Sequence, residues 1–318
     1  MPDIVTLERI IAAADRIGPH IRRTPMIEVT QVRDRPVANR IWLKLECLQV
    51  TGAFKARGAM NRLLTTPPEV LARGIVTASG GNHGLAVARA GLHAGVPTTI
   101  FLPPTASPAK IRALAGWTAD VRVVGEKWDD ADIAARDFAA ATGAVYFHPF
   151  EDADVIAGQG TVALEMLEDL PEAEVYLVAI GGGGLIAGIS TVIHARNPKA
   201  RIIGIEPTGS PTLREALAAG GPVRLEKQWT RVATMSCGMT GPLIYDIVSR
   251  HVEQVVLVED EHLQSAAMWI WREFAIRADL SAAAGIAALQ QGLVTLSPQD
   301  RVCTLICGAD DAAITPPT

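Results

Sequence analysis

The stretch Thr51-Gly52-Ala53-Phe54-Lys55-Ala56-Arg57-Gly58-Ala59 places a lysine among glycine and alanine residues, shortly after the mostly apolar run 41–45. Small residues allow a bulky planar group to approach the backbone closely. A lysine that is partly removed from water has a lowered pKa and becomes a nucleophilic amine. Lys55 is therefore a candidate for covalent attachment of a carbonyl compound. An exposed lysine at the start of a helix is the alternative that this stretch alone leaves open.

Composition and charge narrow the classes of protein to which the chain can belong. Its 318 residues suffice for one large or two moderate domains. A formal net charge of −5 argues against nucleic acid or an anionic membrane as a partner. No apolar run is long enough to span a bilayer, and no signal segment is recognisable. The four cysteines lack disulfide or zinc spacing, so we expect reduced thiols and a cytoplasmic location.

Short β-rich runs alternate with alanine-rich helical runs from residue 74 onward. The expected strands are 74–77, 98–102, 120–124, 144–147, 175–180 and 201–205, and the expected helices are 84–94, 107–114, 128–141 and 185–197. Further helices are expected at 4–17 and 58–64, on either side of a strand at 41–45. This alternation produces right-handed crossovers and parallel sheets. The sequence thus predicts an α/β fold, with 227–242 as an irregular loop near the site.

A second informative stretch, Ser79-Gly80-Gly81-Asn82-His83-Gly84, follows a predicted strand and opens a predicted helix. The unpaired N–H groups of such a turn face the crevice at the carboxyl end of a sheet and suit a carboxylate. Ser79 and Asn82 can add side-chain hydrogen bonds. A plain helix cap, with His83 on a solvated face, is the alternative.

A third stretch consists of four glycines, 181–184, between a predicted strand and a predicted helix. Such a run lets backbone amides surround a phosphate at the helix N-terminus. It also loosely fits a dinucleotide fingerprint, with Glu206 where a ribose-binding acid is expected. That interpretation assigns no role to Lys55. Pyridoxal phosphate (PLP), in contrast, uses both a reactive lysine and a phosphate site.

The final informative stretch is an apolar strand at 302–306 that ends in Cys307-Gly308. Cys307 fits either a buried apolar position or a weak hydrogen-bond donor at a pyridine nitrogen.

The order of these stretches resembles the serine/threonine dehydratase family of fold-type II PLP enzymes, which also contains serine racemases. The similarity includes His148-Pro149-Phe150 and 155–161, and it covers nearly the whole chain. It implies a two-domain, tryptophan synthase β-like fold. The large PLP-binding domain would comprise 1–51 and 149–318, and a small mobile domain would comprise 52–148. A homodimer is also expected.

The resemblance implies a role for each matching residue. Lys55 corresponds to the lysine that carries PLP and acts as general base, Phe54 to the residue beside the ring, and Asn82 to the partner of the ring hydroxyl. The implied substrate-carboxylate loop comprises Ser79, Gly81, Asn82 and His83, the implied phosphate cradle comprises Gly181, Gly182, Gly183 and Gly184, and Cys307 would face the pyridine nitrogen.

Some residues depart from the family pattern. Gly80 stands where racemases carry a serine acid–base group, so we expect weak or absent racemisation. Thr212 stands where the divalent-cation site of the family has a second acid, which leaves Glu206 as the one candidate ligand and makes metal binding doubtful. Asp279 replaces the usual Glu-Pro, and 231–238 differs from the usual Ala-Asp-Gly run. The substrate need not be plain serine or threonine.

The sequence therefore predicts a PLP-dependent ammonia-lyase of amino-acid catabolism. It would remove the β-hydroxyl of a threonine- or serine-type amino acid and release a 2-oxo acid and ammonia. Another PLP reaction on the same fold, β-replacement or racemisation, is the nearest alternative. An NAD-dependent dehydrogenase and a non-catalytic small-molecule binding protein are the others.

Overall fold

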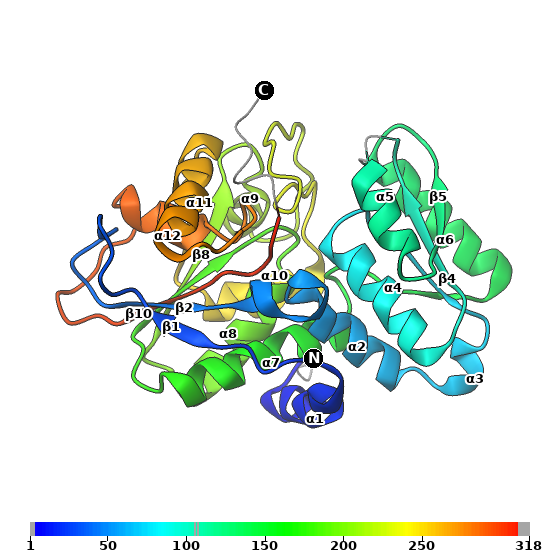
Figure 1. The fold of residues 1–318 in the computed structure, drawn as a ribbon, viewed down its shortest axis with the longest axis horizontal. Coiled ribbons are helices and arrows are strands. Elements are labelled where there is room, and N and C mark those ends of the chain that lie inside the picture. Colours follow the sequence, from blue (N-terminus) through cyan, green and yellow to red (C-terminus); the bar gives the residue numbers. More distant parts are fainter. Residues whose placement is uncertain (1–3, 105, 107, 311–318) are drawn as a thin grey trace.

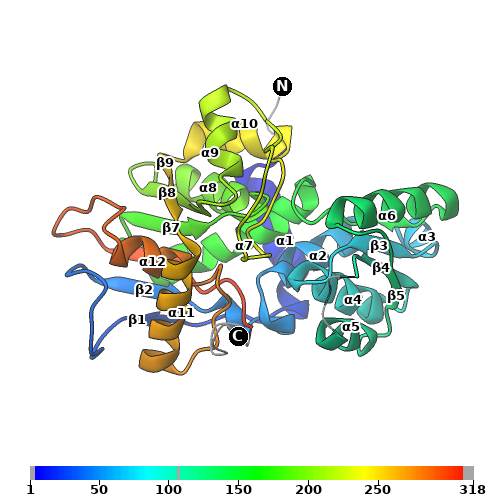
Figure 2. The ribbon, with the colours of Figure 1, turned by 90° about the horizontal axis from the view of Figure 1, so that it is seen from above.

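The computed structural model describes residues 4–104, 106 and 108–310 of the chain. Two sheets, each accompanied by helices, lie side by side in this part of the molecule (Figures 1 and 2). Every pair of neighbouring strands is parallel except the first two strands of the chain. The predicted α/β fold with parallel sheets is therefore confirmed.

The larger sheet combines strands from both ends of the chain. Its strands are β1 (Met26–Glu28), β2 (Ile41–Lys44), β7 (Val175–Ala179), β8 (Arg201–Pro207), β9 (Gln254–Val258) and β10 (Val302–Leu305). Their order is β1-β2-β10-β7-β8-β9, so the last strand of the chain lies between β2 and β7. Sequence patterns predict neither this order nor the strands β1 and β9.

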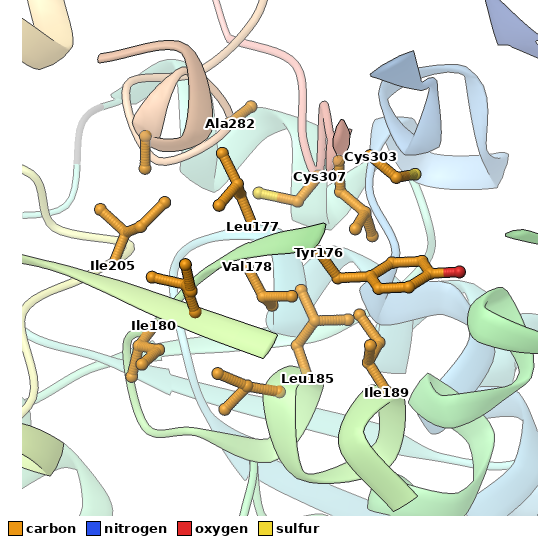
Figure 3. Packing of buried hydrophobic residues seen from close by; sticks show 14 of the residues in the cluster. Tyr176, Leu177, Val178, Ile180, Leu185, Ile189, Ile205, Ala282, Cys303 and Cys307 are labelled. Atoms are coloured by element: carbon orange, nitrogen blue, oxygen red, sulfur yellow. The ribbon is translucent and has the colours of Figure 1, made fainter. Parts of the chain in front are cut away.

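Helices cover the faces of the larger sheet and bury its centre. They are α1 (Leu7–Ile17), α7 (Ala153–Asp169), α8 (Gly184–Arg196), α9 (Thr212–Ala219), α10 (Pro242–His251), α11 (Asp260–Phe274) and α12 (Ala284–Gln290). In β7, Tyr176 and Val178 point toward α8, and Leu177 points toward Ala282 on the opposite face (Figure 3). This alternation along a strand that is covered on both faces explains its continuous apolar sequence.

The smaller sheet is built from one continuous segment of the chain. Its strands β3 (Ile75–Ala78), β4 (Thr98–Leu102), β5 (Asp120–Val123) and β6 (Val145–Tyr146) are arranged in the order β5-β4-β3-β6. The helices of this segment are α3 (Pro68–Leu71), α4 (Asn82–Ala94), α5 (Pro108–Ala115) and α6 (Trp128–Thr142). The sheet falls within the small domain expected at 52–148, whose boundaries remain a prediction.

Helix α2 (Lys55–Thr65) lies between the two sheets and packs against both α7 and α4 (Figure 1). Glycines permit its close contact with α7, because a Cβ atom added to Gly158 would lie only 2.7 Å from the Cα atom of Gly58. The sequence predicts a helix from residue 58, whereas α2 begins at Lys55. We attribute the longer helix to this packing, which compensates for the poor helix propensity of Gly58.

A buried ion network fixes the first turn of α2. Arg57 is fully buried and donates to both carboxylate oxygens of Glu46, at 2.7 and 2.8 Å, and to Glu165 at 2.7 Å. The hydroxyl of Thr24 also donates to Glu46 at 2.6 Å, and the amine of Lys44 lies 2.8 Å from Glu165. Strand β2, helix α2 and helix α7 are thereby joined through charged groups.

Most predicted elements are present with shifted ends. The largest shifts are three residues, at the start of α1 (predicted 4, observed 7) and of α2 (predicted 58, observed 55). Residue 107, the predicted start of one helix, lies outside the described residues. The segment 221–241 contains no helix or strand, as expected for 227–242 up to the start of α10.

We expect Arg57→Met to lower the free energy of unfolding by about 3–5 kcal/mol, because it leaves buried carboxylates without their main partner. Urea unfolding followed by circular dichroism measures this change. Arg201→Met is the matched control, since the side chains of Arg201 and Glu253 are 29% and 44% exposed and their ion pair contributes little. Equal losses in the two variants would contradict the importance of the buried network.

Candidate active site

Three adjacent strands of the larger sheet end at the candidate site. The chain leaves β2 through η2 (Glu46–Leu48) and η3 (Val50–Gly52) to reach Lys55, and β7 leads directly into the glycine run 181–184. Between them, β10 ends just before Cys307. The carboxyl ends of parallel strands are the usual place for ligands in α/β sheets. The fold thus brings together three stretches that are far apart in the sequence.

The segment 307–309, which follows β10, holds the residues before Lys55. Ala53 pairs with Gly308, the amide of Phe54 donates to the carbonyl of Cys307 at 3.1 Å, and the amide of Ala309 donates to Gly52 at 2.9 Å. Thr51 has a φ of 63°, which is unfavourable for a β-branched residue. Such strain often occurs at functional sites. Sequence reasoning offers no signal for it.

The amine of Lys55 lies in a half-buried position, contrary to the alternative of an exposed lysine. It donates to the carbonyl of Pro149 at 2.7 Å and lies 5.2 Å from the centre of the Phe54 ring. Burial lowers the pKa of Lys55 to about 8. Burial also lowers the pKa values of His83 and His148, to about 3 and about 4, so both imidazoles are neutral at pH 7. The amine therefore deprotonates far more readily than an ordinary lysine.

The glycine run forms an open helix N-terminus that is linked to Lys55 through the segment 149–150. Gly183, the N-cap of α8, has a φ of 97°, and no side chain caps the helix. The first amides of a helix have no partner within it, so they remain available to an anion. Phe150 packs against this run, as shown by a Cβ atom built on Gly182, which would lie 2.2 Å from the Phe150 ring. The residue before it, Pro149, is the one that accepts the hydrogen bond from Lys55. Two reasons therefore favour glycine at position 182: close packing against Phe150, and access of a ligand to the backbone amides.

The loop from Ser79 to Gly81 joins β3 to α4. Its turn is tight, since a Cβ atom on Gly84 would lie 1.9 Å from the carbonyl oxygen of Ser79. No side chain caps α4, so its first amides, like those of α8, are open to an anion. His83 is buried, with Nε2 3.0 Å from the carbonyl of Phe147. The alternative that places His83 on a solvated face is therefore wrong.

Asn82 and Cys307, the expected neighbours of a PLP ring, are linked through Asp279 and Ser281. The side-chain amide of Asn82 donates to Asp279 at 3.2 Å, and the hydroxyl of Ser281 donates to Asp279 at 2.5 Å. The sulfur of Cys307 lies 3.5 Å from the oxygen of Ser281. Burial raises the pKa of the Cys307 thiol, which keeps it neutral. Sequence reasoning missed Ser281 and noticed Asp279 only as a departure from a family pattern.

Glu206 serves the structure of the larger sheet. It is fully buried, and its two carboxylate oxygens accept from the amides of Leu213, at 2.7 Å, and Arg214, at 3.0 Å, in the first turn of α9. Burial raises the pKa of Glu206 to about 8. Both carboxyl oxygens of Glu206 are engaged at the start of α9, a structural role that the dinucleotide interpretation does not assign to this residue. Among the described residues, no group of three or more His, Cys, Asp or Glu side chains is placed to hold a metal ion.

We expect Gly183→Ala to weaken PLP retention by about 10-fold or more, because an added Cβ atom would lie 2.6 Å from Ile244 and would distort the anion-binding turn. PLP content after dialysis measures the loss, and a melting curve in excess PLP monitors folding. Gly220→Ala is the matched control, since Gly220 has a φ of 75° but its Cβ atom would meet nothing within 4 Å. If Gly183→Ala retained PLP as well as the wild type does, the assignment of the phosphate to 181–184 would be refuted.

Comparisons with known proteins agree with this geometry. The model of the pyridoxal-phosphate dependent enzyme family matches residues 17–308. The chain is 38% identical over 299 residues to L-threonine ammonia-lyase of Geobacter sulfurreducens, which covers 94% of this chain and 74% of that protein. It is 30% identical over 315 residues to phenylserine dehydratase of Ralstonia pickettii, with coverages of 99% and 95%.

The fold also matches solved structures. Maize serine racemase superposes with a TM-score of 0.92 at 30% identity, over 98% of this chain and 96% of that one. Together with the family match over most of the sequence, this similarity shows that the chain belongs to the family of pyridoxal-phosphate dependent enzymes.

Proposed function

We propose that this protein is an ammonia-lyase that removes the β-hydroxyl of a threonine- or serine-type amino acid. The observation that carries the proposal is the half-buried amine of Lys55, with its lowered pKa, which donates to Pro149, the residue before the Phe150 that packs on the uncapped N-terminus of α8. Two relatives support the reaction class, since the names of L-threonine ammonia-lyase and phenylserine dehydratase both specify β-hydroxy amino acids.

The residues around Lys55 fit PLP. The open amides of α8 suit its phosphate, and Phe54 offers an apolar surface beside the amine. Cys307 is a neutral thiol, so it can donate a weak hydrogen bond to a ring nitrogen but cannot protonate it. We therefore assign the phosphate to 181–184, the ring nitrogen to Cys307 and the ring hydroxyl to Asn82.

The chain contributes binding, orientation and proton transfer to the reaction. PLP, when bound, supplies the electron sink that makes the α-hydrogen of an amino acid acidic. The amides of the loop 79–83 hold the substrate carboxylate at the start of α4. Lys55 takes the α-proton on its Nζ atom, because its pKa of about 8 leaves part of the amine neutral near pH 7. The β-hydroxyl takes up a proton and leaves the neighbouring carbon as water, and a second water hydrolyses the released enamine to the 2-oxo acid and ammonia.

A panel of β-hydroxy amino acids tests this function. We expect 2-oxo acid and ammonia to appear in equal amounts, and Lys55→Ala to lower kcat by about 10³-fold or more, because the general base is lost. Lys199→Ala is the control, since Lys199 is exposed. Borohydride reduction should leave pyridoxyl on Lys55. A pyridoxyl group on another lysine would refute the assignment of Lys55. Bound PLP without elimination from any substrate would refute the proposed ammonia-lyase activity.

Racemisation should be weak, because Gly80 has no side chain to act as a second acid–base group. We expect Gly80→Ser to racemise serine faster than the wild type, as its Cβ atom would lie 3.5 Å from Leu102 and 3.6 Å from Ala106, which are ordinary contacts. Chiral chromatography after long incubation measures both enantiomers, and Gly80→Ala controls for the added carbon. Racemisation by the wild type as fast as elimination would mean that another group supplies the second base.

The expected homodimer and the cytoplasmic location remain predictions. In the described part of the chain, no helix has the length and apolar character needed to cross a bilayer. The four cysteines are all unpaired thiols, which supports a reducing environment. Thr212 stands where the family has a second acid of its divalent-cation site. Its hydroxyl donates a hydrogen bond to the carbonyl of Cys237 at 2.5 Å, so this hydroxyl is already engaged within the protein.

A further inference from the structure

A single buried carboxylate connects the two groups that we assign to the hydroxyl and the nitrogen of the PLP ring. Asp279 accepts from the amide of Asn82 through Oδ2 and from the hydroxyl of Ser281 through Oδ1. Ser281 in turn contacts the sulfur of Cys307. The side chain of Asp279 therefore lies behind Asn82 and Cys307 rather than in direct contact with the proposed ring.

Asp279 is itself held by the segment that follows β10. Its own amide donates to the carbonyl of Gly308 at 3.0 Å, and the residue before it, Ala278, pairs with Ala309. The amide of Ala282 donates to its Oδ1 atom at 2.7 Å. The residue is 4% exposed. A carboxylate with so many fixed contacts can orient a mobile side chain that binds to it.

We propose that Asp279 is a positioning residue that orients the carboxamide of Asn82 for the cofactor. A carboxamide NH₂ group has two hydrogens, and Asp279 accepts only one of them. The second hydrogen remains for the ring hydroxyl oxygen. Rotation of the carboxamide by 180° would place its oxygen against a carboxylate, which is repulsive. Asp279 thus selects the orientation in which Asn82 is a donor.

The same hydrogen bond connects the two sheets. Asn82 opens α4 beside the smaller sheet, whereas Asp279 lies beside β10 of the larger sheet. Gly308 leaves the space in which they meet, because a Cβ atom there would lie 2.4 Å from Oδ2 of Asp279 and 2.8 Å from the amide nitrogen of Asn82. Loss of the bond should therefore affect both the cofactor and the attachment of the loop 79–84.

A double-mutant cycle between Asp279→Asn and Asn82→Ala tests the proposal. The measurements are the PLP affinity of the apoprotein and the pH at which the visible band of bound PLP titrates. We expect Asp279→Asn to weaken PLP binding by about 10-fold to 100-fold, as for a lost hydrogen bond to a charged partner, and to shift the titration of the band. In the Asn82→Ala background, the same change should have an effect below about 2-fold.

Asp260→Asn is the matched control. Asp260 is also buried and accepts from the hydroxyl of Thr230 and the amide of Arg231, both at 2.7 Å. This variant should cost stability but should leave the titration of the band in place. An equal effect of Asp279→Asn in both backgrounds, or no effect on the wild type, would overturn the proposal, since a merely structural role does not depend on Asn82.

Gly308→Ala provides an independent test if Asp279→Asn does not fold. It leaves both partners chemically intact but separates them, so it should reproduce the weaker PLP binding and the shifted band. A folded Gly308→Ala variant with wild-type affinity and titration would overturn the proposal. The inference rests on the proposed cofactor site and not on the substrate. PLP binding without elimination would therefore refute the proposed activity and leave the role of Asp279 intact.

Discussion

The position of Lys55 depends on the buried ion pairs of the Arg57 guanidinium. Arg57 lies two residues after Lys55 in α2. Its guanidinium binds Glu46, which follows β2, and Glu165 on α7. Burying these charges is costly, and the cost is offset only when every partner is in place. A small displacement of α2 would break several charge-assisted bonds at once. The network therefore fixes Lys55 relative to the larger sheet.

Close backbone contacts extend this constraint to the anion site. Helix α7 meets α2 at Gly58 and Gly158, and it meets α8 at Gly160 and Gly188, where a Cβ atom on Gly188 would lie 2.6 Å from the amide nitrogen of Gly160. Helix α7, which touches the lysine-bearing helix α2, thus also touches α8, whose N-terminus we assign to the cofactor phosphate. Larger residues would push these helices apart and separate the amine from the amides.

One physical effect, removal from water, prepares several groups of the site. It lowers the pKa values of Lys55 and His83 and raises that of the Cys307 thiol. Burial also raises the pKa of Asp279, but the hydrogen bonds from Ser281, Ala282 and Asn82 act in the opposite direction and favour its carboxylate. In each case removal from water by itself favours the neutral form over the charged form. A neutral amine can take a proton, and a neutral thiol can donate only a weak hydrogen bond. These shifts are those that the proposed roles of Lys55 as a proton acceptor and Cys307 as a neutral donor require.

The sequence by itself determined the features that depend on local patterns. Alternating β-rich and alanine-rich runs specify parallel strands and crossover helices, and small residues around Lys55 and the run 181–184 mark the positions that we propose for the ligand. These signals depend on residues that are close in the chain, so they are recognisable from the sequence without a structure.

Only the tertiary structure decided which distant groups meet. The insertion of β10 between β2 and β7, the burial of His83 and the capping of α9 by Glu206 all depend on contacts across long sequence separations. The bond between Asn82 and Asp279 joins residues 197 positions apart. A carboxylate or an imidazole looks the same in the sequence whether it binds a ligand or caps a helix. Its surroundings decide its role, because burial and hydrogen-bond partners set both its charge and its reach.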